Sequence, residues 1–125
     1  MTSTATTLKA DLAQFTGTEQ VYRHMFGMKF TDGVKYMADV AKAYWLIDVI
    51  ASHAQKRVNR SRPFMVARLV VKDGSATFTL HEDWSDSEPK KFKAIARQRI
   101  PFTDFPLESI KFYVCSGLIM LPSEY

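Results

Sequence analysis

Apolar and polar positions divide the chain into a helical first half and a strand-forming second half. Leu8, Leu12 and Phe15 have the i, i+4, i+7 spacing of a helix, which Thr7 can cap and Gly17 can end. The pattern therefore predicts a short first helix, preceded by a flexible tail over residues 1–7.

Two more helices are predicted in the next segment. Thr31 or Asp32 can cap the first of them. Its apolar stripe consists of Val34, Met37, Ala38 and Ala41. Residues 43–57 continue the helical pattern with apolar side chains around most of the circumference, so we expect cover on more than one side and a kink at 41–43. Residues 18–30 fit neither period, and we expect an irregular strand there.

A tight hairpin is the sharpest expectation in the second half. Asp73-Gly74 lies between two alternating runs and predicts a two-residue type I′ turn. The resulting register pairs Lys72 with Ser75, Val70 with Thr77, Arg68 with Thr79, and Val66 with His81. The core face then carries Met65, Ala67, Leu69, Val71, Ala76, Phe78 and Leu80. The opposite, exposed face carries Arg68, Lys72, Ser75, Thr77, Thr79 and His81.

A third strand and a second hairpin complete the pattern. In the third strand, Phe92, Ala94, Ala96 and Ile100 alternate with Lys91, Lys93, Ile95, Arg97 and Arg99. Residues 110–115 then alternate as well, and Ser116-Gly117 can turn the chain back through 118–121. We therefore expect an α+β fold in which the N-terminal helices pack on one face of an antiparallel sheet of four or five strands.

Composition narrows this picture. A chain of 125 residues suits one domain, which we place at 8–125. Cys115 is the only cysteine, which excludes an internal disulfide and favours a reducing compartment. The N-terminus lacks the features of a secretory signal, and the longest apolar run is far shorter than the ~20 residues of a membrane span. We expect a cytoplasmic protein that does not enter a membrane.

The sequence carries no strong signal for catalysis. Its glycines form no phosphate-binding loop, and His24, His53 and His81 lie on different predicted elements without metal-ligand spacing. We expect no cofactor, no metal and no catalytic residue. The alternative is a small enzyme that uses Cys115, or His24 with a carboxylate.

Basic side chains are the one grouping that suggests a function. The third strand would place its cations beside those of the first hairpin on one exposed sheet face. This candidate binding face consists of Arg68, Lys72, Lys91, Lys93, Arg97 and Arg99. The net charge of +4 permits an anionic partner without requiring one, and such a face can also serve only solubility.

The preferred interpretation is a non-enzymatic interaction module that binds a protein partner, and the alternative is DNA or RNA binding by the same face. Leu118, Met120 and an unpaired final strand could also support a homodimer.

Two blocks of sequence resemble a known family. They are the segment FTDGVKYMADVAKAYWLIDVIASH, and IPFTDFPLESIKFYV together with the terminal LPSEY. The resemblance is to domain of unknown function 6876, an uncharacterised family of bacterial plasmids and phages. It implies no activity and no site residues, but it implies a mobile-element setting, in which small proteins often bind and block host machinery.

Overall fold

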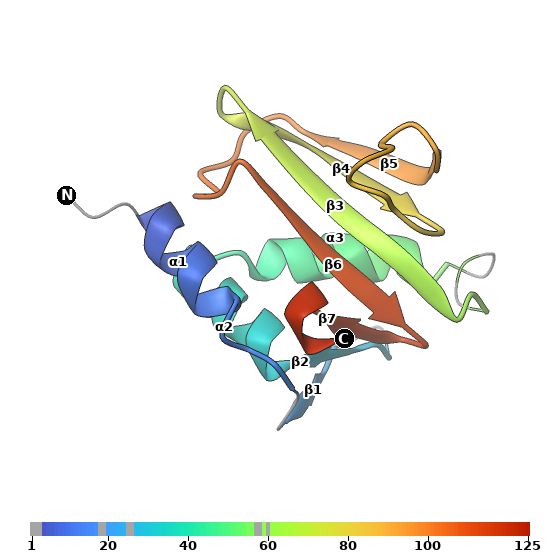
Figure 1. Ribbon diagram of the computed structural model, residues 1–125, viewed down its shortest axis with the longest axis horizontal. Coiled ribbons are helices and arrows are strands. Elements are labelled where there is room, and N and C mark those ends of the chain that lie inside the picture. Colours follow the sequence, from blue (N-terminus) through green and yellow to red (C-terminus); the bar gives the residue numbers. More distant parts are fainter. Residues whose placement is uncertain (1–3, 18–19, 25–26, 57–58, 60) are drawn as a thin grey trace.

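A computed structural model of the chain describes residues 4–17, 20–24, 27–56, 59 and 61–125. Within these residues it contains three α-helices and a seven-stranded mixed sheet, and so has the predicted α+β class (Figure 1). The helices are α1 (Thr4–Leu12), α2 (Asp32–Ala41) and α3 (Tyr44–Ala54), with a final 3-10 turn η1 (Pro122–Glu124). The strands are β1 (Val21–Arg23), β2 (Lys29–Thr31), β3 (Phe64–Lys72), β4 (Ser75–His81), β5 (Ala94–Ile100), β6 (Ser109–Cys115) and β7 (Leu118–Met120).

The sheet is larger than predicted and is not wholly antiparallel. Its order is β1-β2-β7-β6-β3-β4-β5, and β2 pairs with β7 in parallel. A hairpin of β1 and β2 replaces the single irregular strand expected at 18–30, because strands of three residues are too short to show a period of two. The expectation of an unpaired final strand was also wrong, since β7 lies between β6 and β2.

The predicted helix ends are confirmed for α2 and wrong for α1, which ends at Leu12, before Phe15 and Gly17. The Thr31 hydroxyl accepts a hydrogen bond from the Val34 N–H at 3.2 Å and caps α2. Lys42, with φ of 53°, ends α2 at the predicted break. Thr7 is not a cap, because α1 begins at Thr4; residues 4–7 of the predicted tail are helical, and residues 1–3 lie outside the described part.

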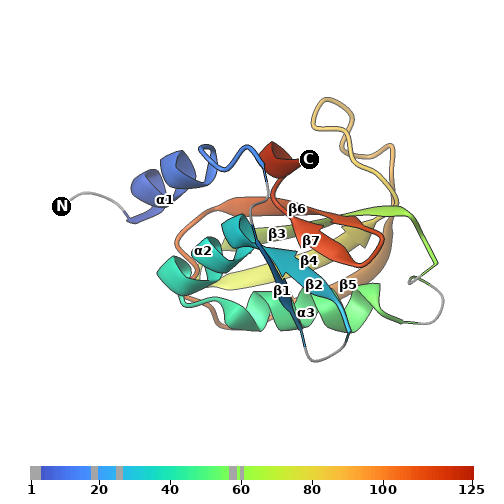
Figure 2. The same ribbon diagram turned by 90° about the horizontal axis from the view of Figure 1, so that it is seen from below.

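Helices α2 and α3 cover one face of the sheet, while the loop between β4 and β5 and the turn η1 lie on the opposite side (Figure 2). On α3, Leu46, Ile47 and Ile50 are buried. Its first turn is less covered than predicted, because Tyr44 is 44% exposed.

Both hairpins have the predicted turns. Asp73 and Gly74 have φ of 53° and 76°, and the pairing of β3 with β4 follows the expected register at every position. Ser116 and Gly117, with φ of 49° and 85°, join β6 to β7 in the same way. Leu69, one of the seven side chains assigned to the core side of the first hairpin, is fully buried. The side chains on the opposite side of this hairpin therefore point away from α2 and α3.

Candidate functional site

Cationic side chains form a row across four adjacent strands on the face of the sheet opposite α3. Lys111 of β6 lies opposite Arg68 of β3, Arg68 lies opposite Thr79 of β4, and Thr79 lies opposite Arg97 of β5. Residues that lie opposite one another in a sheet share a face, so the basic residues of this row point the same way. Arg99, two residues after Arg97, lies on that face as well. We call this side of β6, β3, β4 and β5 the outer face.

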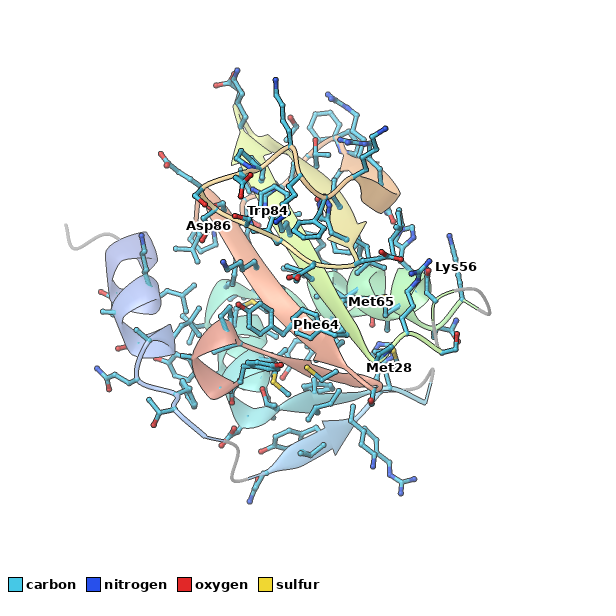
Figure 3. The ribbon with its side chains drawn as sticks, turned by 45° about the vertical axis from the view of Figure 1, so that its right-hand side comes forward. Met28, Lys56, Phe64, Met65, Trp84 and Asp86 are labelled. Atoms are coloured by element: carbon cyan, nitrogen blue, oxygen red, sulfur yellow. The ribbon has the colours of Figure 1, made fainter. Side chains whose placement is uncertain are left out.

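The loop of residues 82–93 folds back over the outer face, which the sequence pattern did not predict. The Arg68 guanidinium lies 3.7 Å from the Trp84 ring centre, and the His81 ring lies 4.9 Å from it. Figure 3 shows Trp84 and Asp86 in front of the sheet, on the side away from α3. Thr79 and His81 were expected to be exposed, but they are buried (7% and 5% exposed) because this loop covers them.

His81 lies beneath the loop with both of its ring nitrogens within hydrogen-bond distance of a partner. Its Nδ1 lies 3.1 Å from the Phe92 carbonyl, and its Nε2 lies 2.9 Å from the Thr79 hydroxyl oxygen. A carbonyl can only accept, so Nδ1 carries the hydrogen and Nε2 accepts from Thr79. Burial lowers the pKa of His81, and the positive charges of Arg68 and Arg97 lower it further. Hydrogen bonds to the backbone raise this pKa, but they do not offset the lowering.

The loop also brings a carboxylate onto the outer face. Asp86 accepts a hydrogen bond from the Trp84 indole N–H at 2.8 Å and another from the Lys111 ammonium at 3.0 Å. The hydrogen bond from Lys111 is the main reason that the pKa of Asp86 lies below its usual value. Near the base of the loop, Glu82 pairs with Arg62. The outer face therefore already holds an acidic and aromatic segment of its own chain.

A groove of about 850 Å³ lies between this loop and strands β3, β4 and β5. Three of the predicted binding residues, Arg68, Lys93 and Arg97, line it together. The other three lie apart from the groove. Arg99 is exposed further along β5, and Lys72 borders a second depression beside Glu108.

Lys91 does not lie on the sheet, because β5 begins only at Ala94. Its ammonium lies 5.5 Å from the Phe92 ring centre. Lys93 also precedes the strand, so the predicted third strand began too early.

Three contributors to the outer face were missed from the sequence: Trp84, Asp86 and Lys111. Lys111 had the correct parity within its strand, but only the pairing of β6 with β3 places it beside Arg68. Trp84 and Asp86 belong to a polar loop without periodicity, and no local signal indicated that the loop would return to the sheet.

Of the two candidate catalytic groups, Cys115 and His24, the structure gives His24 the carboxylate partner that the enzyme alternative requires. Cys115 lies on the outer face, and burial raises the pKa of its thiol, which disfavours the reactive thiolate. The carboxylate beside His24 is Asp48 of α3, with 2.6 Å between Nε2 and Oδ1. Among the described residues, no group of three or more His, Cys, Asp or Glu side chains is placed to hold a metal.

Comparison with known proteins shows the family of the chain. A family model matches residues 6–125, a range that includes every strand of the sheet. The chain belongs to the family of unknown function DUF6876. No curated protein and no solved structure matches it. The outer face, its covering loop and η1 all lie within the DUF6876 match. In the part of this DUF6876 chain that the structure describes, no helix has both the length and the apolar character needed to cross a bilayer.

Proposed function

We propose that this DUF6876 protein is a non-enzymatic binding module that captures an acidic segment of a partner protein on its outer face. The observation that carries the proposal is the placement of Lys111, Arg68 and Arg97 in one row across four strands. A row of cations in fixed positions favours a partner whose negative charges are spaced to match it.

The chemistry of the covering loop supports carboxylates as the ligand. Asp86, the loop's own carboxylate, is bound by Lys111 and by the indole of Trp84. The same loop carries further acidic residues, which are Glu82, Asp83 and Glu88, and Glu82 pairs with Arg62. In the plasmid or phage setting that the resemblance implies, the partner would be a component of the host machinery.

The test compares a glutamate-rich peptide with a single-stranded oligonucleotide of equal charge. We expect tighter binding of the peptide, and a loss of at least about tenfold in affinity when Arg97→Glu and Arg99→Glu are combined. Lys9→Glu is the matched control, because Lys9 is an exposed cation on α1. Peptide binding that the double substitution leaves unchanged would contradict the proposal.

Nucleic-acid binding by the outer face is the second candidate, because of a cluster of aromatic rings there. Phe64, Tyr113 and Tyr125 have ring centres 5.1–5.6 Å apart, and Tyr125 is 76% exposed. Exposed rings beside cations can stack on the bases of a single strand. This candidate predicts oligonucleotide affinity that falls steeply between about 50 and 200 mM salt and weakens in Tyr125→Ala. A flat salt response excludes it.

A further inference from the structure

Strand β5 forms one edge of the sheet, and one side of its backbone faces no other strand among the described residues. The sheet order ends at β5, so β4 is its only strand neighbour among the described residues. The edge is seven residues long, whereas β1 at the opposite edge has three. An edge strand of this length offers unpaired N–H and C=O groups to another extended chain.

The register shows which groups of β5 point away from the sheet. The Val71 N–H donates to the Glu108 carbonyl at 2.8 Å, so odd-numbered residues of β3 turn their backbone groups away from β4. Even-numbered residues of β3 therefore bond to Thr77 and Thr79 of β4, which leaves Phe78 and Leu80 to bond to β5.

On β5, the residues opposite Phe78 and Leu80 are Gln98 and Ala96. These two turn their backbone groups toward β4, so Arg97 and Arg99 turn theirs toward the free edge. The side chains of Arg97 and Arg99 are exposed on the outer face beside that edge. The same two residues thus combine free backbone hydrogen-bonding groups with positive charge.

We propose that β5 receives an extended acidic segment of a partner protein by strand addition, with alternate carboxylates beside Arg97 and Arg99. The inference rests on the proposed function and specifies the mode of binding. Main-chain hydrogen bonds to the edge supply affinity, and the side chains that alternate along the added strand supply selectivity.

Charge also decides against a second copy of the chain as the occupant. When two β5 edges pair antiparallel, opposite residues share a face, so Arg97 and Arg99 of one copy meet the same residues of the other. Like charges directly opposite are destabilising, whereas carboxylates in those positions are attracted. On the other face of β5, Gln98 Oε1 accepts a hydrogen bond from His53 Nε2–H of α3 at 2.8 Å, so the Gln98 side chain is already engaged with the body of the protein.

The test uses a seven-residue peptide, the length of β5, in which Glu alternates with Val. In one companion peptide the backbone nitrogen of every Glu is methylated, and in the other the backbone nitrogen of every Val. Each pattern removes the N–H groups along one edge of the peptide. Because only one edge pairs with β5, we expect one companion to lose at least about tenfold in affinity and the other to bind like the parent. Equal effects of the two methylation patterns, or failure of the parent peptide to bind, would overturn strand addition.

Amide hydrogen exchange provides an independent measurement on the full chain. Saturation with the parent peptide should slow exchange at Arg97 and Arg99, while the amides of Ala96 and Gln98 should be slow with and without peptide. Unchanged exchange at Arg97 and Arg99 overturns the inference. If methylation has no selective effect but Arg97→Glu with Arg99→Glu still abolishes peptide binding, strand addition fails and the proposed function stands. If neither the peptide methylation nor the double substitution changes peptide binding, both proposals fail.

Discussion

Trp84 changes the surroundings of three side chains at once, because its ring covers the outer face at the middle of the sheet. It stacks on Arg68, lies against His81 and donates its indole N–H to Asp86. A cation over an indole ring contributes about 0.5–2 kcal/mol, depending on how far the pair is withdrawn from water. The burial of His81, which lowers its pKa, follows from the cover that this loop provides.

The lowered pKa of His81 predicts how stability changes with pH. Below the ordinary histidine pKa of 6.5, the unfolded chain takes up the proton first, so the free energy of unfolding should fall as pH drops from 6.5 toward the lower pKa of the folded state. Trp84→Ala should hydrate His81, raise its pKa and weaken this dependence, with a loss of about 1–2 kcal/mol at neutral pH. NMR titration of the His81 ring and urea unfolding at several pH values measure the two effects.

Trp84→Phe is the matched control, because it keeps a ring over Arg68 and His81 while removing the hydrogen bond to Asp86. It should retain most of the shift in the His81 pKa. A His81 pKa that stays the same in Trp84→Ala would show that the ring does not control the hydration of this histidine.

At the level of elements, the C-terminal turn η1 packs against the start of α2 and is hydrogen-bonded to it. Glu124 is 9% exposed, and its Oε1 accepts hydrogen bonds from the Thr31 hydroxyl at 2.6 Å and from the Leu121 N–H at 2.9 Å. Burial raises the pKa of this carboxyl despite those hydrogen bonds. Gly33 lies directly beneath it, and a Cβ there would come within 2.8 Å of the Glu124 and Leu121 side chains. The last residues of the chain therefore help to hold a helix that begins more than ninety positions earlier.

Gly33→Ala tests this contact between η1 and α2. The added methyl group should force Glu124 and Leu121 away from α2 and reduce the free energy of unfolding by about 1–3 kcal/mol, as overpacking of a tight contact does. Urea denaturation measures the loss. Gly17→Ala is the control, since nothing lies within 4 Å of a Cβ at that position. Equal stability of the two variants would contradict the proposed contact.

For the molecule as a whole, charge on the free edge of β5 bears on its state of association. Arg97 and Arg99 stand where a second sheet would pair, and exposed edges without charge tend to associate. Combining Arg97→Val and Arg99→Val should therefore promote dimers or larger species, which size-exclusion chromatography with light scattering detects. Lys9→Val is the control for loss of a surface charge away from the edge. A double variant with the association state of the unmodified chain would show that these charges do not protect the edge.

The sequence alone determined the features that depend on residues close together in the chain, such as tight turns and helix caps. The turn at Asp73-Gly74 sets the register of β3 with β4, and this parity places Arg68 on the same face as Thr79. The cap at Thr31 also follows from local chemistry.

Only the tertiary structure decided how distant segments meet. It placed Lys111 beside Arg68, inserted β7 between β2 and β6, and laid Trp84 over Arg68. These contacts join residues whose separation in the chain leaves no periodic signal, and each depends on how the whole sheet buries its apolar surface. In the strands long enough to alternate, the sequence thus indicates which way the side chains point, whereas packing across the sheet determines which of them become neighbours and which remain open to a partner.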